Sequence, residues 1–224
     1  MIDHHQEPLT DGFYLVFSDP NMSSTAEYVY HILLATKFVQ GDSARIPLQG
    51  CTALLTGMTT DTNNFANSVI PTTFPMATDL IARGVDREAI LENLYNRYRE
   101  NRLRLQGYLL KDVMKISGNG VSVMILTRKD IEKYQIEEGE TEGFVNLPLS
   151  IDKVKVSFFI KQEADAYRVS IRSKGDIKVN ECSKLYFSGG GHSRAAGGKL
   201  PLSMTPEEVV AYTFEKAEAF LLRK

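Results

Sequence analysis

One carboxylate and two imidazoles stand side by side near the start of the sequence, as Asp3, His4 and His5. Carboxylate and imidazole ligands at this density suit a divalent transition metal such as Mn²⁺ better than Ca²⁺. A polar surface cluster or the remnant of an affinity tag would also give this triplet. Tags normally carry more consecutive histidines, however, and ordinary folded sequence follows. The triplet is therefore a candidate metal or acid–base site, with those alternatives open.

A further carboxylate, Asp61, lies in the polar segment TTDTNNF at residues 59–65. We expect a helix over residues 48–58 to end just before this segment, which places Asp61 in a loop. A loop carboxylate could ligate a metal while the neighbouring hydroxyls and amides bond to the backbone. A single aspartate in such a segment commonly makes a turn or caps a helix instead, so the position of Asp61 alone does not decide between the two.

The third feature is the glycine-rich segment FSGGGHSRAAGG at residues 187–198. Glycines allow positive φ and a close approach of the backbone to a ligand, so that amide groups can face an anion. His192 follows the three consecutive glycines directly. Arg172 and Ser173, at the end of an expected strand, add a guanidinium and a hydroxyl that could hold a phosphate. Many glycine-rich segments are plain turns, so this segment alone is weak evidence.

Several elements in the first half of the chain must position the triplet and Asp61. The apolar run FYLVF at residues 13–17 predicts a buried strand. Ser24 and Glu27 fit a capping box, which predicts that a helix begins there. One long helix is expected over residues 86–110, because apolar residues recur there at helical spacing.

The second half of the chain alternates between strand-like and helix-like segments. Runs rich in β-branched and aromatic residues predict strands at residues 121–126, 153–161 and 167–173. A short polar stretch joins the last two as a hairpin. An amphipathic helix that begins at Thr205 or Pro206 closes the chain. The pattern indicates an α/β protein of two units, whose boundary falls in or just after the long helix.

The composition restricts the classes of partner and compartment. A formal net charge of −2 over 224 residues argues against a broad, non-specific surface for nucleic acid or membranes, although it leaves room for a local basic cleft. No apolar run approaches the roughly 18 residues of a membrane helix. Cys51 and Cys182 have no zinc-like spacing and are expected to be reduced and packed. We therefore expect a cytoplasmic protein without a membrane partner.

Taken together, five motifs resemble the DHH phosphoesterases. The resemblance is to the branch with a DHH-associated C-terminal domain, which includes the oligoribonuclease/pAp-phosphatase enzymes and RecJ exonuclease. The motifs occur in the order of that family and span almost the whole chain, as DHH at residues 3–5, SSTAEYVY at 23–30, TDTNNF at 60–65, SIRSKG at 170–175 and GGGHSRAAGG at 189–198.

This resemblance implies a fold in two parts. Residues 1–110 would form the C-terminal part of a doubly wound parallel-sheet DHH domain together with a linker helix. Residues 116–224 would form a smaller α/β domain with a mixed sheet, the DHH-associated substrate-binding domain. Members of the family carry an upstream segment with further metal ligands, and only Met1 and Ile2 precede Asp3 here. A strand needs roughly five residues, so we expect the chain to be incomplete at its N-terminus.

The resemblance also implies roles for the residues of the first part. His4 matches an imidazole that ligates Mn²⁺, for which Mg²⁺ is an alternative. Asp3 and His5 match its neighbours, which orient the site and assist the chemistry. Asp61 matches the later aspartate that ligates the metal pair. The implied reaction is hydrolysis of a phosphate ester by a two-metal mechanism.

In the second part, Arg172, Ser173 and His192, with the amides around Gly190 and Gly191, match the groups that hold the phosphate or terminal nucleotide of the substrate. The implied substrates are short oligoribonucleotides (nanoRNA) and nucleotide bisphosphates such as 3′-phosphoadenosine 5′-phosphate (pAp). Hydrolysis of cyclic dinucleotides is the nearest alternative. A non-catalytic fragment that binds nucleotides or RNA is the alternative from another class, and a homodimer is left open.

Overall fold

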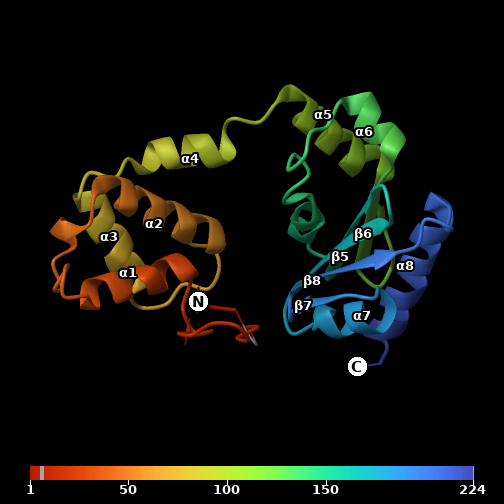
Figure 1. Ribbon diagram of the computed structural model, residues 1–224. Helices are drawn as coiled ribbons and strands as arrows, with labels where there is room; N and C mark the ends of the chain where they lie inside the picture. The colour runs from red at the N-terminus through yellow and green to blue at the C-terminus, as the bar shows by residue number, and fades with distance from the viewer. Residues whose placement is uncertain (6–7, 224) are drawn as a thin grey trace. The chain divides into compact units, whose positions relative to one another are not determined.

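The computed structural model describes residues 1–5 and 8–223, which form two compact units (Figure 1). Unit 1 extends to Arg97 and unit 2 begins at Tyr98. The division therefore falls earlier than residue 110, where the sequence analysis ended the first domain. No helix in the described part of the chain is both long and apolar enough to span a membrane.

Unit 1 is mainly helical. Its elements are the strands β1 (Ile2–Asp3) and β2 (Phe17–Ser18), the helices α1 (Thr25–Ala35), α2 (Leu48–Asp61), α3 (Thr73–Ala82) and α4 (Arg87–Tyr95), and a 3₁₀ turn (Ser43–Arg45). The first three helices pack around one apolar cluster, in which Leu55, Met58 and Leu80 are fully buried. Ser24 is the N-cap of α1, as its residue type predicts.

The strand predicted over residues 13–17 is wrong in extent and in burial. Only Phe17 belongs to β2, which pairs in parallel with the two residues of β1. Phe13 and Leu15 are more than half exposed, and Tyr14 is fully exposed. Parallel strands usually have both faces covered by other elements. The described part of the chain does not cover this apolar run, so its side chains are exposed.

The long helix expected over residues 86–110 is interrupted. Helix α4 ends at Tyr95, and α5 (Glu100–Tyr108) leads into a π turn (Leu109–Val113). Each half belongs to a different core, since Ile90 packs in unit 1 whereas Leu105 packs in unit 2. Helical spacing of apolar residues continues across the break, so the sequence pattern does not reveal it.

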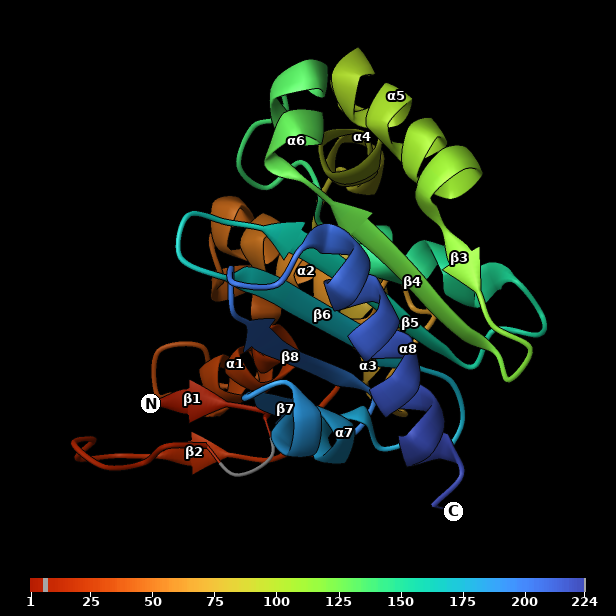
Figure 2. The same cartoon turned by 90° about the vertical axis from the view of Figure 1, so that its right-hand side faces the viewer.

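Unit 2 is built on a six-stranded mixed sheet in the order β3-β4-β5-β6-β8-β7, in which only β4 and β5 are parallel (Figure 2). The strands are β3 (Lys115–Ile116), β4 (Val121–Leu126), β5 (Val156–Gln162), β6 (Tyr167–Ser173), β7 (Gly190–His192) and β8 (Ala195–Leu200). The remaining elements are the helices α6 (Arg128–Tyr134), α7 (Val179–Tyr186) and α8 (Pro206–Leu221), and a 3₁₀ segment (Phe144–Ser150). The predicted mixed sheet, its β5–β6 hairpin and the Thr205 cap of α8 are confirmed.

The two faces of this sheet are covered differently. Helices α7 and α8 pack on one face, where Phe158, Val169 and Ile171 are buried. On the other face, α5, α6 and the 3₁₀ segment enclose a smaller cluster around Met124 and Phe159. This second face also carries the charged residues described below.

Both cysteines are free and buried, one in each unit. Burial raises the pKa of the Cys51 thiol in unit 1, and it raises the pKa of the Cys182 thiol in unit 2 to about 12. The expectation of packed thiols is confirmed, and no disulfide joins them. Because the protonated thiol is a poor nucleophile, each cysteine should react with a thiol reagent only when its own unit opens.

Candidate functional site

Asp3 organises the Asp3-His4-His5 triplet through one carboxylate oxygen. Its Oδ1 accepts hydrogen bonds from the backbone N–H of His4 (2.8 Å), the backbone N–H of His5 (3.3 Å) and Nδ1 of His5 (2.6 Å). The hydrogen bond from His5 lowers the pKa of the Asp3 carboxyl below its ordinary value. No described residue donates to Oδ2, so Oδ2 is the Asp3 oxygen available to a ligand.

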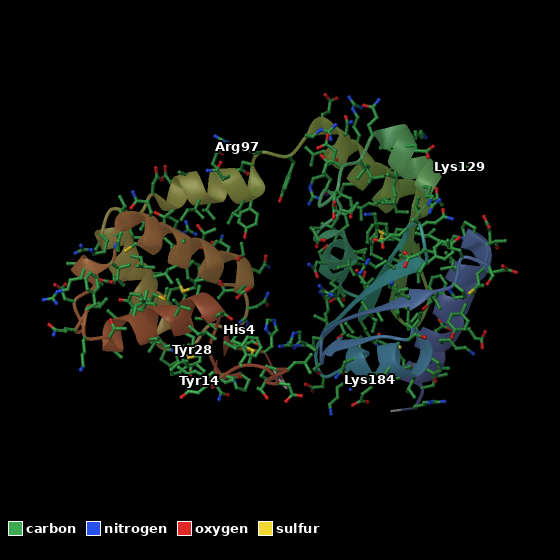
Figure 3. All side chains as sticks on the ribbon, viewed as in Figure 1. His4, Tyr14, Tyr28, Arg97, Lys129 and Lys184 are labelled. Atoms are coloured by element: carbon green, nitrogen blue, oxygen red, sulfur yellow. The ribbon has the colours of Figure 1, made fainter. Side chains whose placement is uncertain are left out.

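The start of α1 orients the imidazole of His4, which is labelled in Figure 3. Nδ1 of His4 lies 2.8 Å from the hydroxyl of Thr25, the first residue of that helix. The His4 and His5 rings stack with their centroids 4.6 Å apart. Thr25 was not among the predicted site residues, although it lies in the SSTAEYVY motif of the family resemblance, because a separation of 21 positions gives no pattern that relates it to His4.

Asp61 lies beside His4, but on a helix and not in the predicted loop. It is the last residue of α2, and its Oδ2 is 3.9 Å from Nδ1 of His4. In this polar segment, Thr59 and the C-cap residue Thr62 donate their hydroxyls to backbone carbonyls four residues earlier, an arrangement open to threonine in a helix. The threonines that suggested a loop are therefore satisfied within the helix.

These side chains gather ligand atoms of the types that bind a cation. One ligand atom each from Asp3, His4 and His5 lies within 4.8 Å of the other two, and the Asp61 carboxylate adjoins His4. A carboxylate with imidazoles fits a divalent transition metal. In the described part of the chain, however, these four residues do not supply enough ligands to complete the coordination of two such ions.

Glu27, in the first turn of α1, has a buried carboxylate that the sequence analysis did not predict. The Glu27 side chain is fully buried and accepts hydrogen bonds from the hydroxyls of Ser23, Thr72 (2.5 Å) and Thr73 (2.7 Å). Nε2 of His31 is 3.6 Å away. Only half of the predicted capping box forms, because the Glu27 backbone N–H donates to Ser24 while its carboxylate joins α1 to the start of α3.

Arg172 and Ser173 are neighbours on β6 and point to opposite faces of the sheet. The Ser173 hydroxyl is buried and donates to the carbonyl of Ile177 (2.6 Å). The Arg172 guanidinium lies on the other face and donates to the carbonyl of Ile171 (2.9 Å). Burial lowers the pKa of the Arg172 guanidinium, and the charge of Glu142 opposes this shift. The structure therefore does not bring these two side chains to one ligand.

His192 shares the face of Arg172. In the sheet register, Ala195 of β8 pairs with Arg172 on one side and with His192 on the other. The two outer Cα atoms are thus about 10 Å apart, twice the spacing of neighbouring strands. Gly191 of the same hairpin has φ +138°, and a Cβ there would lie 2.6 Å from the Ala195 carbonyl oxygen, so backbone packing requires this glycine.

The other two glycines of the run differ in the space around them. A Cβ at Gly189 would lie 1.9 Å from the carbonyl oxygen of Gly197, whereas a Cβ at Gly190 would meet only Cε of Lys184, at 3.9 Å. At Gly189 and Gly191 a glycine is therefore required because the backbone of β8 lies too close for a side chain, whether or not a ligand binds. Gly190 is the position at which ligand binding can be tested without disturbing the hairpin.

This contrast gives a stability prediction. Gly189→Ala should destabilise unit 2 by about 3 kcal/mol because a backbone segment must shift, whereas Gly190→Ala should cost less than about 1 kcal/mol. The measurement is the urea concentration at which Cys182 becomes reactive in each variant. Equal midpoints for the two variants would contradict the structural explanation of Gly189.

A family profile described as "DHHA1 domain" matches residues 110–221 of the chain. The match includes β3 to β8 and α6 to α8, which are the sheet of unit 2 and all of its helices except α5. It covers half of the chain and includes Arg172, His192 and the glycine-rich hairpin.

Two curated relatives and one solved structure extend the match across both units. A Streptococcus mutans protein named "Probable bifunctional oligoribonuclease and PAP phosphatase NrnA" is 30% identical over 88% of this chain and 60% of its own length. The cyclic-di-AMP phosphodiesterase PdeA of Listeria monocytogenes is 28% identical over 89% of this chain and 29% of its own length. The crystal structure of an exopolyphosphatase-related protein from Bacteroides fragilis has a TM-score of 0.90 and 34% identity, over 100% of this chain and 65% of that chain.

The chain is therefore shorter than the relatives that it matches. It spans about three fifths of the length of the Streptococcus mutans protein. The relatives' names describe enzymes that act on phosphate esters.

Proposed function

Since the chain belongs to the DHHA1 family, we propose that it forms part of a metal-dependent phosphoesterase that hydrolyses short oligoribonucleotides and nucleotide bisphosphates such as pAp. The observation that carries the proposal is the gathering of Asp3, His4 and His5 at the end of β1, with Asp61 beside His4. A protein that only binds nucleotides has no need of this cluster. The names of the oligoribonucleotide-cleaving relatives support the choice of substrate.

The residues that would hold a metal are His4 and Asp61, with Oδ2 of Asp3 as a further ligand. Bound Mn²⁺ or Mg²⁺ would supply Lewis acidity to a phosphoryl oxygen, and the two-metal mechanism of the proposal needs ligands beyond these residues. Asp3 fixes the turn of the triplet by accepting three hydrogen bonds at Oδ1. Thr25 orients the His4 ring, as outer-shell partners of metal-ligating histidines do.

Unit 2 would contribute to substrate binding through one face of its sheet. Arg172 offers a planar guanidinium that can contact two phosphate oxygens at once. His192 and the amide of Gly190 lie on the same hairpin and are the further proposed contacts. Ser173 was proposed with them from the sequence, but its hydroxyl donates to the carbonyl of Ile177 and its backbone N–H donates to the carbonyl of Arg194, so both of its donors are already used within unit 2.

A substrate panel tests this function. The chain, and a form extended upstream by the segment that the family resemblance predicts, would be assayed with Mn²⁺ on a diadenylate, on pAp and on cyclic di-AMP. We expect the extended form to release AMP from the diadenylate and phosphate from pAp, at rates at least about tenfold above cleavage of cyclic di-AMP. Preferred cleavage of cyclic di-AMP would favour the activity named for the Listeria relative. Hydrolysis of none of the three would overturn the proposal.

A further inference from the structure

The separation of His4 from Asp61 depends on how two helices of unit 1 pack. His4 is held at the start of α1, because its Nδ1 lies 2.8 Å from the hydroxyl of Thr25. Asp61 is the last residue of α2, and its Oδ2 lies 3.9 Å from the same Nδ1. Because one candidate ligand is held at α1 and the other lies on α2, the distance between them follows the distance between these two helices.

Helices α1 and α2 pack side by side and approach one another very closely (Figure 1). Ala26 directly follows Thr25 in α1, and Gly57 lies about one turn before Asp61 in α2. A Cβ at Gly57 would lie 2.9 Å from Cβ of Ala26. Carbon atoms in ordinary contact are at least about 3.5 Å apart, so an alanine at position 57 would force the helices apart by roughly 0.6 Å.

The backbone at Gly57 gives no reason for a glycine. The residue lies inside α2 and has none of the positive φ values that favour glycine. A glycine in the interior of a helix weakens that helix relative to alanine. The close contact with Ala26 therefore accounts for this glycine. Residues four apart lie on the same face of a helix, so this contact and the Asp61 side chain are on one side of α2.

The polar contacts of Glu27 leave the separation of α1 from α2 to packing. They join α1 to Thr72 and Thr73, near the start of α3. Among the described residues, Cβ of Ala26 is the only atom within 4 Å of a Cβ built at Gly57, apart from the chain neighbours and the backbone of α2 itself. The spacing at this end of the two helices is therefore sensitive to the side chains at positions 26 and 57.

We propose that Ala26 and Gly57 are positioning residues of the candidate metal site. Their contact holds α1 and α2 close enough for the His4 imidazole and the Asp61 carboxylate to ligate one cation. The inference rests on the proposed function for the identity of that cation as Mn²⁺ or Mg²⁺. Metal–ligand distances vary by only about 0.2 Å, which is less than the separation that a methyl group at position 57 would force.

The test is the affinity of the extended form for Mn²⁺ without substrate, measured from the electron paramagnetic resonance signal of free Mn²⁺. Gly57→Ala should weaken binding by about 10- to 100-fold, as the loss of a supporting contact at a metal site usually does. The double variant Ala26→Gly/Gly57→Ala moves the methyl group from one helix to the other and should recover the affinity to within about threefold. Gly50→Ala is the matched control in the first turn of α2, because a Cβ there meets only a side-chain methyl of Ile46, at 3.3 Å.

A cycle with Asp61→Asn separates positioning from general damage to unit 1. If Gly57 acts by placing Asp61, Gly57→Ala should have little further effect on Mn²⁺ affinity once that carboxylate is removed. Both Ala26 and Gly57 are partly exposed, so the helices can separate there without opening the core, and protection of Cys51 from labelling checks the fold of each variant. Ala26→Val crowds the same contact from α1 and should also weaken Mn²⁺ binding.

Three results would each overturn the inference: an unchanged Mn²⁺ affinity in Gly57→Ala, a loss that the double variant does not recover, or an equal loss in the Asp61→Asn background. An unaltered protein that binds Mn²⁺ and hydrolyses none of the three substrates would refute the proposed function alone. Normal Mn²⁺ binding and normal hydrolysis in Gly57→Ala would refute this inference alone. No Mn²⁺ binding by the unaltered extended form would refute both.

Discussion

Replacing Glu27 with alanine should lower the free energy of unfolding of unit 1 by about 3 kcal/mol or more. The carboxylate is fully buried and accepts hydrogen bonds from three hydroxyls, two of which belong to Thr72 and Thr73 at the start of α3. Its removal leaves these donors without an acceptor in a site that excludes water. Each buried donor left without an acceptor costs about 1–3 kcal/mol, so the loss of an acceptor shared by three hydroxyls should reach about 3 kcal/mol or more.

The two buried cysteines allow this effect to be assigned to one unit. Urea-dependent labelling of each thiol, quantified by mass spectrometry, would report opening of unit 1 through Cys51 and of unit 2 through Cys182. We expect Glu27→Ala to expose Cys51 at a lower urea concentration and to leave Cys182 unchanged. Glu92→Ala, at an exposed position of α4, is the matched control and should change stability by less than about 0.5 kcal/mol. Identical Cys51 midpoints in the two variants would show that the Glu27 network adds little.

The Glu27 network also shows which contacts a local sequence pattern can predict and which it cannot. Ser24 and Thr205 were predicted as helix starts because a cap depends on residues within one turn. The partners of Glu27 lie more than 40 positions away, at Thr72 and Thr73. No pattern of spacing relates them, so the sequence predicted a capping role for Glu27 and the structure shows a contact between two helices.

The candidate site was predictable to a different degree in each unit. The DHH triplet is contiguous, so its grouping needs little more than a turn, and the proximity of Asp61 to it was expected from the family resemblance. The separation of Arg172 from Ser173 follows from strand alternation, which is local. The close contact of Ala26 with Gly57 could not be predicted, because it depends on how α1 and α2 pack against each other.

Replacing His4 with alanine should reduce Mn²⁺-dependent hydrolysis by the extended form by at least about a thousandfold, since a proposed metal ligand is lost. The His4 imidazole lies between the other groups of the site, because it contacts the hydroxyl of Thr25 and lies beside the carboxylate of Asp61. Thr25→Val removes only the hydroxyl that orients the ring. It should therefore weaken Mn²⁺ binding by about 10- to 100-fold, as is usual for partners of metal-ligating histidines.

These two variants separate ligation from folding. Unit 1 should stay folded in both, because neither side chain belongs to its apolar cluster, and protection of Cys51 from labelling checks this. Saturating Mn²⁺ should restore activity to Thr25→Val and not to His4→Ala. Restoration of both would indicate that His4 is not a ligand but only supports the local backbone.

The most direct test of the proposed metal site is therefore the rate of diadenylate hydrolysis by the extended form, measured against Mn²⁺ concentration, with and without His4. We expect a rate that rises with Mn²⁺ and saturates in the unaltered protein, and a rate near background at every Mn²⁺ concentration in His4→Ala. A His4→Ala protein that is folded and hydrolyses diadenylate at the unaltered rate would contradict the assignment of the Asp3-His4-His5 cluster as the catalytic metal site.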